Sequence, residues 1–267
     1  MVDVTKKVKQ FVREQGLDLV GIASTARLDE LTPAGYNRPK DLLPESKSTI
    51  VMALRWNDAL VDGLPEIRPM YSRMMIMMNN LLDTTVLKIS HFLQEKGFLA
   101  MPIHASDPYD LIDLKGVISH KHAAVQAGLG EFGLNNLLLT PQFGPRQRFA
   151  QILTDAELIP DKPIDQNLCR AMTPKCRFAC INVCPYGYIP NKYKKDPKVM
   201  KKTSVEGVAI DKQGCSYYQD RGLPKMGRNG YTYRCGLCIT ACPVGSDIPK
   251  RETIAKGIRP LSSVGMK

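Results

Sequence analysis

Eight cysteines, all lying between residues 169 and 242 of a 267-residue chain, constrain this sequence more than any other feature. They form two groups along the chain, each of which ends in the pattern C-x3-C-P. The first group is Cys169, Cys176, Cys180 and Cys184, and the second is Cys215, Cys235, Cys238 and Cys242. The stretch CGLCITACP at 235–243 shows the ending most clearly. The way in which these eight thiols, within 74 residues, are bonded therefore limits which folds the chain can adopt.

The expected cellular compartment decides how these cysteines are interpreted. The first twenty residues scatter charges among the apolar positions and contain no uninterrupted hydrophobic region of the kind a secretory signal requires. No segment approaches the roughly 18 consecutive apolar residues needed for a membrane span. We therefore expect a cytoplasmic protein without a membrane span, in which disulfides are rare and metal or cluster ligation is favoured.

The repeated C-x3-C-P ending favours iron–sulfur clusters over zinc. In bacterial ferredoxins a C-x2-C-x2-C-x3-C-P run supplies three ligands to one [4Fe–4S] cluster, and its fourth cysteine binds the other cluster. The early spacings here depart from that run, but the crossing rule predicts two sets of four. One set is Cys169, Cys176, Cys180 and Cys242, and the other is Cys184, Cys215, Cys235 and Cys238. Two structural zinc sites are the alternative, since CGLC alone suits a zinc knuckle.

Composition and hydrophobic periodicity predict two domains. The polar joint IPDKPIDQN at 159–167 precedes every cysteine, so we place a boundary near residue 162, giving domains at 1–162 and 163–267. Helices and strands alternate in the first domain, which is typical of a layered α/β protein. Helices are expected at about 4–15, 71–96 and 116–127, and strands at 18–24, 48–56, 98–105 and 146–154.

Charge points to a partner without identifying it. The formal net charge is +11, and the run NKYKKDPKVMKK at 191–202 holds six lysines. The run is interpreted either as a solvated loop or as a docking face for an acidic electron donor or an RNA.

Four stretches in this order resemble the epoxyqueuosine reductase family and its relatives, the reductive dehalogenases. They are GLDLVGIAS, PKDLLPESKSTIVMAL, AGLGEFGLNNLLLTPQFGPRQRFAQILTDAEL and the two cysteine motifs, and the resemblance covers about residues 10–245. Epoxyqueuosine reductases continue into helical repeats thought to grip tRNA, whereas this chain ends some 25 residues after Cys242, so a tRNA substrate is doubtful. The glycine loop is closer to reductive dehalogenases, which carry a twin-arginine export signal that we do not find.

The resemblance implies an α/β (α+β) fold, with a nitroreductase-like cobalamin-binding domain followed by a ferredoxin-like domain holding two [4Fe–4S] clusters. Glycines in AGLGEFG permit close backbone approach to a bulky ligand, so the loop is a candidate cofactor-binding segment. The alternative is that the loop is a plain helix-to-strand turn without a ligand. Arg146 and Arg148 alternate along a strand, which places both on one face, and they are candidate partners for cobalamin amide or phosphate groups. Exposed decoration of the strand is the alternative. The predicted cofactor-binding residues are Gly128, Gly130, Gly133, Asn135, Asn136, Thr140 and Arg146.

The family's proton-donating aspartate lies ahead of the helix that enters AGLG. Its nearest match is Asp113, displaced by about one position, and Tyr109 and Asp110 are the other candidates. A helix-capping or solvated role is the alternative for each. His120 and His122 fall on different helix faces, so we expect them to be structural rather than joint ligands of a metal.

These observations predict an oxidoreductase in which two clusters pass single electrons to a cobalamin that reduces a small-molecule substrate. The electron donor would be a protein such as ferredoxin or flavodoxin. Two alternatives stay open. One is a non-catalytic accessory protein that reduces or carries cobalamin for a separate corrinoid protein, and the other is a reductase that uses FMN on the same fold.

Overall fold

The structure is a computed structural model that describes residues 2–106, 109–110, 112–195, 206–223, 225–226, 231–232 and 234–245. Part of the lysine run, 196–202, lies outside the described residues. The helices up to residue 160 are α1 (Val2–Glu14), α2 (Thr25–Leu31), α3 (Pro39–Leu42), α4 (Asp58–Asp62), α5 (Arg68–Gln94) and α6 (His120–Gln126). The strands there are β1 (Leu19–Ser24), β2 (Ser48–Arg55), β3 (Ala100–Ile103), β4 (Tyr109–Asp110), β5 (Lys115–Gly116), β6 (Glu131–Phe132), β7 (Leu138–Leu139) and β8 (Gln147–Thr154).

A four-stranded sheet in the order β1-β2-β8-β3 forms the centre of this region, and every pair in it is antiparallel. The α+β description in our prediction is therefore the accurate one. In the register, Ile22 pairs with Ile50, which pairs in turn with Ile152. Because side chains alternate between the faces of a strand, this row of isoleucines points to one side and its neighbours point to the other.

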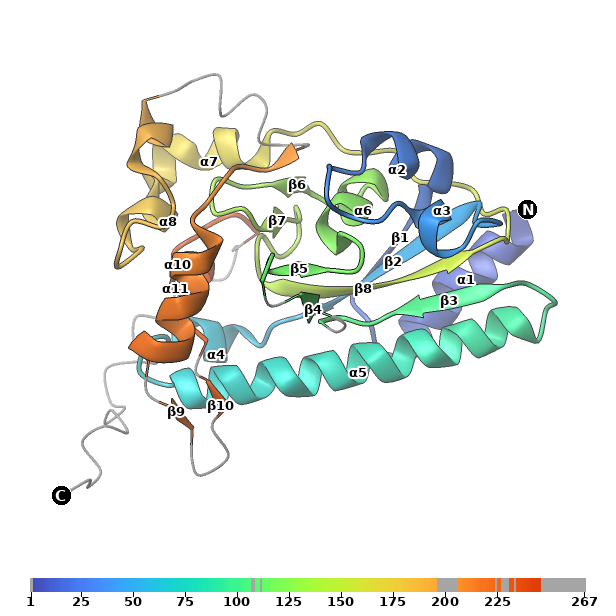
Figure 1. Cartoon of the computed structure of the whole chain (residues 1–267), viewed down its shortest axis with the longest axis horizontal. Coiled ribbons are helices and arrows are strands. Elements are labelled where there is room, and N and C mark those ends of the chain that lie inside the picture. The colour runs from blue at the N-terminus through green and yellow to red at the C-terminus, as the bar shows by residue number, and fades with distance from the viewer. Residues whose placement is uncertain are drawn as a thin grey trace.

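Both faces of the sheet are covered by helices, as Figure 1 shows with α5 along one side and α6 on the other. Residues of α1 and α5, including Val8 and Val86, pack with the isoleucine row. On the opposite face, Val51 and Phe149 pack with the small side chains of α6 such as Ala123. Burial on both faces explains why β2 is mostly apolar, whereas β8 also buries polar side chains such as Gln151.

Most predicted elements of this region are confirmed, and one boundary was wrong. The helix expected at 116–127 begins at His120, because Lys115–Gly116 forms β5 against β4 and Ser119 caps the helix. Ser119 Oγ accepts a hydrogen bond from the His122 backbone N–H at 3.4 Å. The long helix α5 begins with Pro69 in its first turn, where proline is tolerated, and ends shortly before Gly97.

The cysteine-bearing region is built from short elements and few buried side chains. Its helices are α7 (Leu168–Cys176), α8 (Ala179–Asn182), α10 (Lys212–Tyr217) and α11 (Leu237–Thr240), with a 3₁₀ turn η1 (Asn191–Lys194) and a π-helical turn η2 (Tyr218–Gly222). A small ribbon pairs β9 (Lys225–Met226) with β10 (Tyr231–Thr232). Among the described residues, none of α7, α10 and α11 contains a buried side chain.

Two buried or half-buried carboxylates join this region to the sheet region. Glu131 of β6 accepts hydrogen bonds from the backbone N–H groups of Gln166, Asn167 and Leu168 at 2.8–3.1 Å, at the start of α7. Asp161 accepts from Lys9 Nζ at 2.6 Å and from the Ile22 N–H at 2.8 Å. The joint predicted at 159–167 is thus an extended connection tied to the sheet region.

The described part of the chain contains no helix both long enough and apolar enough to cross a membrane.

Candidate functional site

All eight cysteines are partly buried and none forms a disulfide. Cys169 and Cys176 of α7, Cys180 of α8 and Cys242 line one small apolar cavity, together with Leu134 and Met172. These four are one of the two sets that the crossing rule predicts. Burial, followed by the nearby thiols of Cys169, Cys242 and Cys176, raises the pKa of the Cys180 thiol to about 12.

The other four cysteines are also electrostatic neighbours. Burial raises the pKa of Cys238, and Cys235, Cys180, Cys215 and Cys184 all add to that increase. Burial likewise raises the pKa of Cys215, with Cys235 and Cys184 as the next causes. Since Cys238 interacts with Cys180 as well, the two sets lie side by side. Thiols with pKa values raised in this way are neutral on their own, and a bound cationic centre would stabilise them as thiolates, which fits the donor chemistry of an iron–sulfur cluster.

The two C-x3-C-P motifs repeat a backbone pattern as well as a sequence. A left-handed residue precedes each short helix, Phe178 before α8 and Gly236 before α11. In each motif a cysteine follows two residues later, Cys-Pro stands at the helix end, and a left-handed glycine comes two residues after the proline, at Gly187 or Gly245. The two motifs therefore share a local backbone pattern as well as a cysteine spacing. Among the described residues, no three His, Cys, Asp or Glu side chains are grouped so as to hold a single metal ion.

A cavity of about 670 Å³ lies between the sheet region and the second cysteine set. Its volume falls within the range of roughly 300–1,000 Å³ typical of ligand and cofactor sites. Cys215 and Gln219 line it from the cysteine region, and Gln219 Nε2 donates to the Cys215 carbonyl at 3.3 Å. One cysteine of the second set therefore borders the cavity directly.

Positive charge dominates the cavity wall. In the part of the chain that the structure describes, the lining has one carboxylate, Asp220, against five cations, Lys115, Lys121, Arg148, Lys212 and Arg234. Arg148 Nε donates to Asn79 Oδ1 at 2.5 Å and its Nη2 donates to Ser106 Oγ at 2.7 Å, so its charge has neutral partners. A wall of this kind suits a ligand that carries amide, carboxylate or phosphate groups.

Lys121 is the most perturbed cation of the wall. Its Nζ donates to the Asn136 carbonyl at 2.8 Å and lies near the ring of Phe132. Burial, followed by the charge of Lys212, lowers the pKa of Lys121 to about 8. Its ammonium group can therefore release a proton near neutral pH.

The two histidines of α6 are buried neutral side chains. Burial lowers the pKa of His120 to about 4, against the opposing effect of its 2.7 Å hydrogen bond to the His104 carbonyl. Burial lowers the pKa of His122 to about 4 as well, with Lys121 as the next cause. The Nδ1 atom of His120 and the Nε2 atom of His122 are buried without a hydrogen-bond partner in the described structure. His122 Nδ1 contacts Ser119 Oγ at 2.6 Å, which favours the structural role expected for it.

Of the predicted cofactor residues, Asn135 and Asn136 line the cavity. Asn135 Nδ2 also donates to the Cys238 carbonyl at 3.3 Å, which connects the cavity wall to the second cysteine set. Asn136 adopts the left-handed conformation (φ 56°), and this turns its carbonyl toward Lys121.

The three glycines of the loop are packed against the chain itself. A Cβ at Gly128 would meet the carbonyl of Lys162, and one at Gly130 would meet the carbonyl of Leu139. A Cβ at Gly133 would meet the Asn135 side chain. Close packing accounts for each of these glycines, and their contact with a cofactor stays a prediction.

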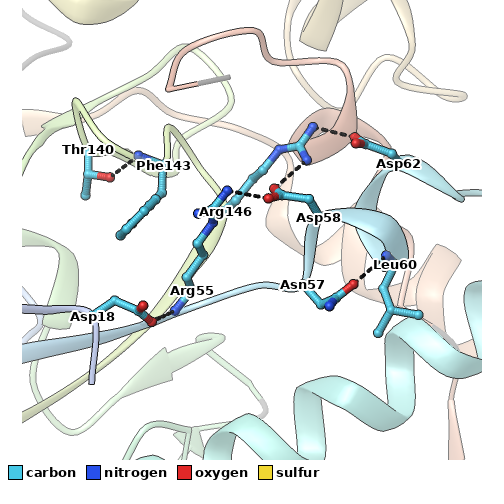
Figure 2. Close-up of polar contacts among 9 residues, drawn as sticks. All are labelled: Asp18, Arg55, Asn57, Asp58, Leu60, Asp62, Thr140, Phe143 and Arg146. Atoms are coloured by element: carbon cyan, nitrogen blue, oxygen red, sulfur yellow. Dashed lines mark hydrogen bonds and ion pairs between the residues drawn. The ribbon is translucent and has the colours of Figure 1, made fainter. Parts of the chain in front are cut away.

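Thr140 and Arg146 lie apart from the cavity lining. Figure 2 shows Arg146 beside α4, where Nη1 contacts Asp58 Oδ1 at 2.9 Å and Nη2 contacts Asp62 Oδ1 at 2.6 Å. Asp58 also pairs with Arg55. Thr140 is fully buried, and its Oγ1 accepts from the Phe143 N–H at 3.0 Å. The structure gives both side chains a role in packing, and it does not test their predicted contact with a cofactor.

The predicted acids do not converge on the cavity. Asp113 is exposed and pairs with Lys115 at 2.8 Å. Asp110 accepts hydrogen bonds from the Ile112 and Asp113 N–H groups, and these bonds lower its pKa. The Tyr109 backbone belongs to β4, but its side chain lies outside what the structure describes. Sequence reasoning missed Lys121, Lys212, Gln219 and Arg234 as cavity residues, and only the proximity of Lys121 to the glycine loop could have signalled one of them.

Comparison with known proteins places this geometry in context. No family model matches the chain. A tetrachloroethene reductive dehalogenase of Desulfitobacterium hafniense is 34% identical over 164 residues, covering 58% of this chain and 25% of the relative. An epoxyqueuosine reductase of Bacillus cereus is 25% identical over 276 residues, covering 92% of this chain and 67% of the relative.

Solved structures share the fold. A catabolic reductive dehalogenase matches with a TM-score of 0.64 and 20% identity, over 89% of this chain and 31% of that one. An epoxyqueuosine reductase bound to an epoxyqueuosine-modified tRNA stem loop matches with a TM-score of 0.61 and 17% identity, over 95% and 68% of the two chains. The chain spans about a quarter of the dehalogenase relative's length. The resemblance predicted from the motifs is confirmed: the chain is similar in sequence to reductive dehalogenases and epoxyqueuosine reductases.

Proposed function

We propose that this protein is an iron–sulfur oxidoreductase in which two [4Fe–4S] clusters pass single electrons to a cobalamin held in the large cavity, where a small substrate is reduced. The observation that carries the proposal is the position of Cys215, which belongs to one cysteine set and also lines the cavity. A cluster held by this set would stand next to whatever the cavity binds. The names of the relatives support a reductase.

The two cysteine sets would act in series. Cys184, Cys215, Cys235 and Cys238 would hold the cluster beside the cavity, and Cys169, Cys176, Cys180 and Cys242 would hold the one farther from it. This order also fits the two domains proposed at 1–162 and 163–267, because the cavity draws its walls from both.

The cavity residues fit a corrinoid, which carries amide side chains and a phosphate. Asn135, Asn136 and Gln219 can bond amides, while Lys121 and Lys212 can pair with a phosphate. When bound, cobalamin would supply a low-potential cobalt centre that delivers electrons to the substrate. The chain's own part is to orient that group, to exclude water and to supply a proton.

We assign the proton to Lys121 Nζ in preference to Asp113. Lys121 lines the cavity and has a pKa of about 8, whereas the Asp113 carboxylate is exposed and paired with Lys115. Tyr109 stays a second candidate. The matched test compares turnover of Lys121→Met with that of Asp113→Asn at equal cobalt content. Loss of turnover in the aspartate variant alone would reverse the assignment.

Cobalt binding tests the cofactor directly. Anaerobically prepared protein incubated with hydroxocobalamin and desalted should retain about one cobalt per chain. The Asn136→Asp variant should retain less, because a carboxylate would then face the amide and phosphate groups of the cofactor. A yellow chromophore that is released on denaturation, with no cobalt retained, would favour the FMN-dependent reductase instead.

A non-catalytic role is favoured by one observation. Among the described residues, the cavity lining contains a single carboxylate, Asp220, and the predicted proton donor Asp113 is not part of that lining. An accessory protein that reduces or carries cobalamin for a separate corrinoid protein needs no proton donor. Such a protein would reduce bound cobalamin and pass it on, yet show no turnover with any small substrate in the Lys121 and Asp113 comparison.

A further inference from the structure

The region around the first cysteine set carries an unbalanced positive charge. From residue 166 to residue 195 the chain has no Asp or Glu, and its six cations are Arg170, Lys175, Arg177, Lys192, Lys194 and Lys195. Asp165 is the last acid before this stretch, and Asp196 is the first after it. Four of the eight cysteines lie within the same thirty residues.

Three of these cations are sequence neighbours of the cysteines of α7. Arg170 directly follows Cys169, and Lys175 and Arg177 flank Cys176. All three residues are exposed, and none of them forms an ion pair with a described residue. Figure 1 shows α7 at the edge of the molecule, on the other side of the sheet region from α5.

The position of this patch fits an entrance for electrons. The first cysteine set lines its own small cavity, whereas the second set supplies Cys215 to the large one. Electrons bound for the large cavity would therefore reach the first set before the second. Exposed cations next to the cluster that receives the electron would attract a negatively charged partner and increase its rate of association.

We propose that Arg170, Lys175 and Arg177 form the docking surface for an acidic protein that carries one electron. This inference rests on the proposed function. In the complex the reduced carrier loses one electron, the cluster held by Cys169, Cys176, Cys180 and Cys242 gains it, and no proton or covalent bond is exchanged.

The test compares wild-type protein with the triple variant Arg170→Glu/Lys175→Glu/Arg177→Glu. Its matched control, Lys6→Glu/Arg13→Glu/Lys40→Glu, makes the same change in net charge at exposed residues of α1 and α3. Bleaching of the iron–sulfur absorbance is followed by stopped flow with two donors, a reduced acidic [2Fe–2S] ferredoxin and dithionite. Electrostatic steering accelerates association by roughly 10- to 1,000-fold, so we expect the patch variant to react with ferredoxin at least about tenfold more slowly at low salt. Dithionite should reduce all three proteins, although its own charge can produce small differences in rate.

The outcomes separate the two proposals. Equal rates with ferredoxin for the patch and control variants overturn the docking surface and leave the clusters intact. If dithionite fails to bleach the wild-type protein, the proposed function fails and the docking surface fails with it. A relative was crystallised with a tRNA stem loop, so a tRNA anticodon stem loop is titrated in parallel. Loss of RNA binding in the patch variant, with an unchanged ferredoxin rate, would assign the surface to RNA instead.

Discussion

The sheet region and the cysteine region of this protein are stabilised in different ways. In the first, Ile50, Ile152 and their neighbours are fully buried between α1, α5 and α6. In the second, α7, α10 and α11 bury no side chain among the described residues, and the apolar core there is a small cluster around Ile181 and Ile189. Hydrophobic burial can hold the first region in place, whereas in the second the proposed clusters would have to complete the fold.

The largest expected effect comes from removing the metal. Stripping iron with a chelator under anaerobic conditions should leave β2 and β8 protected from hydrogen exchange while the amides of α7, α10 and α11 exchange as an unfolded chain does. The measurement is hydrogen–deuterium exchange by mass spectrometry before and after chelation. If the amides of α7 stay protected in the iron-free protein, the fold of the cysteine region does not depend on bound metal.

Within the sheet region, the ion pairs of Arg146 should matter most (Figure 2). Its side chain is only 4% exposed and contacts both Asp58 and Asp62. Arg146→Ala leaves two half-buried carboxylates without their cation, which costs about 3–5 kcal/mol when a buried pair is broken. Urea unfolding measures the loss, and exposed Arg13→Ala, within about 0.5 kcal/mol of wild type, is the control. If Arg146→Ala is as stable as wild type but loses cobalamin, the residue binds the cofactor as its sequence context predicted.

A smaller effect is expected at the junction of the two regions. Glu131→Gln keeps the shape of the side chain but removes its negative charge. The Glu131 carboxylate accepts hydrogen bonds from three backbone N–H groups at the start of α7. Weakening these charge-assisted bonds should cost about 1–3 kcal/mol. Exposed Glu157→Gln should change nothing. The unfolding free energy of iron-loaded protein reports the difference, and equal stability of the two variants would mean that Glu131 does not couple the regions.

The smallest effect is a dependence of stability on pH. His120 and His122 have pKa values of about 4 in the folded protein, below the usual 6.5. Between pH 6.5 and 4 the unfolded chain binds protons that these buried rings cannot, so the unfolding free energy should fall as the pH drops through that window. His120→Gln should make the fall shallower in urea titrations at pH 7, 6, 5 and 4. An unchanged slope would show that His120 already has access to water.

Sequence patterns predicted the sheet region well because its signals are local. The apolar run at 48–56 and the glycine after α5 each mark an element through its own residues. The start of α6 was misplaced, since Gly116 was interpreted as part of the helix while it pairs with Tyr109 in a strand. Pairing of this kind depends on residues that a single segment does not reveal.

The candidate site was predicted in part for the same reason. The repeated C-x3-C-P ending led to two cysteine sets, which stay a prediction. The thiols near Cys180 belong to its own set, whereas those near Cys238 come from both sets. The cavity wall instead gathers Lys121, Arg148, Lys212 and Arg234 from segments far apart in the chain. No local pattern brings those cations together, and none shows that Arg146 faces α4 while Arg148 faces the cavity.

The metal content of anaerobically purified protein tests the central claim most directly. Two four-cysteine sets that each hold a cubane predict about eight irons per chain, with an equal amount of acid-labile sulfide. Colourless protein that contains about two zinc ions per chain and no iron would contradict the account.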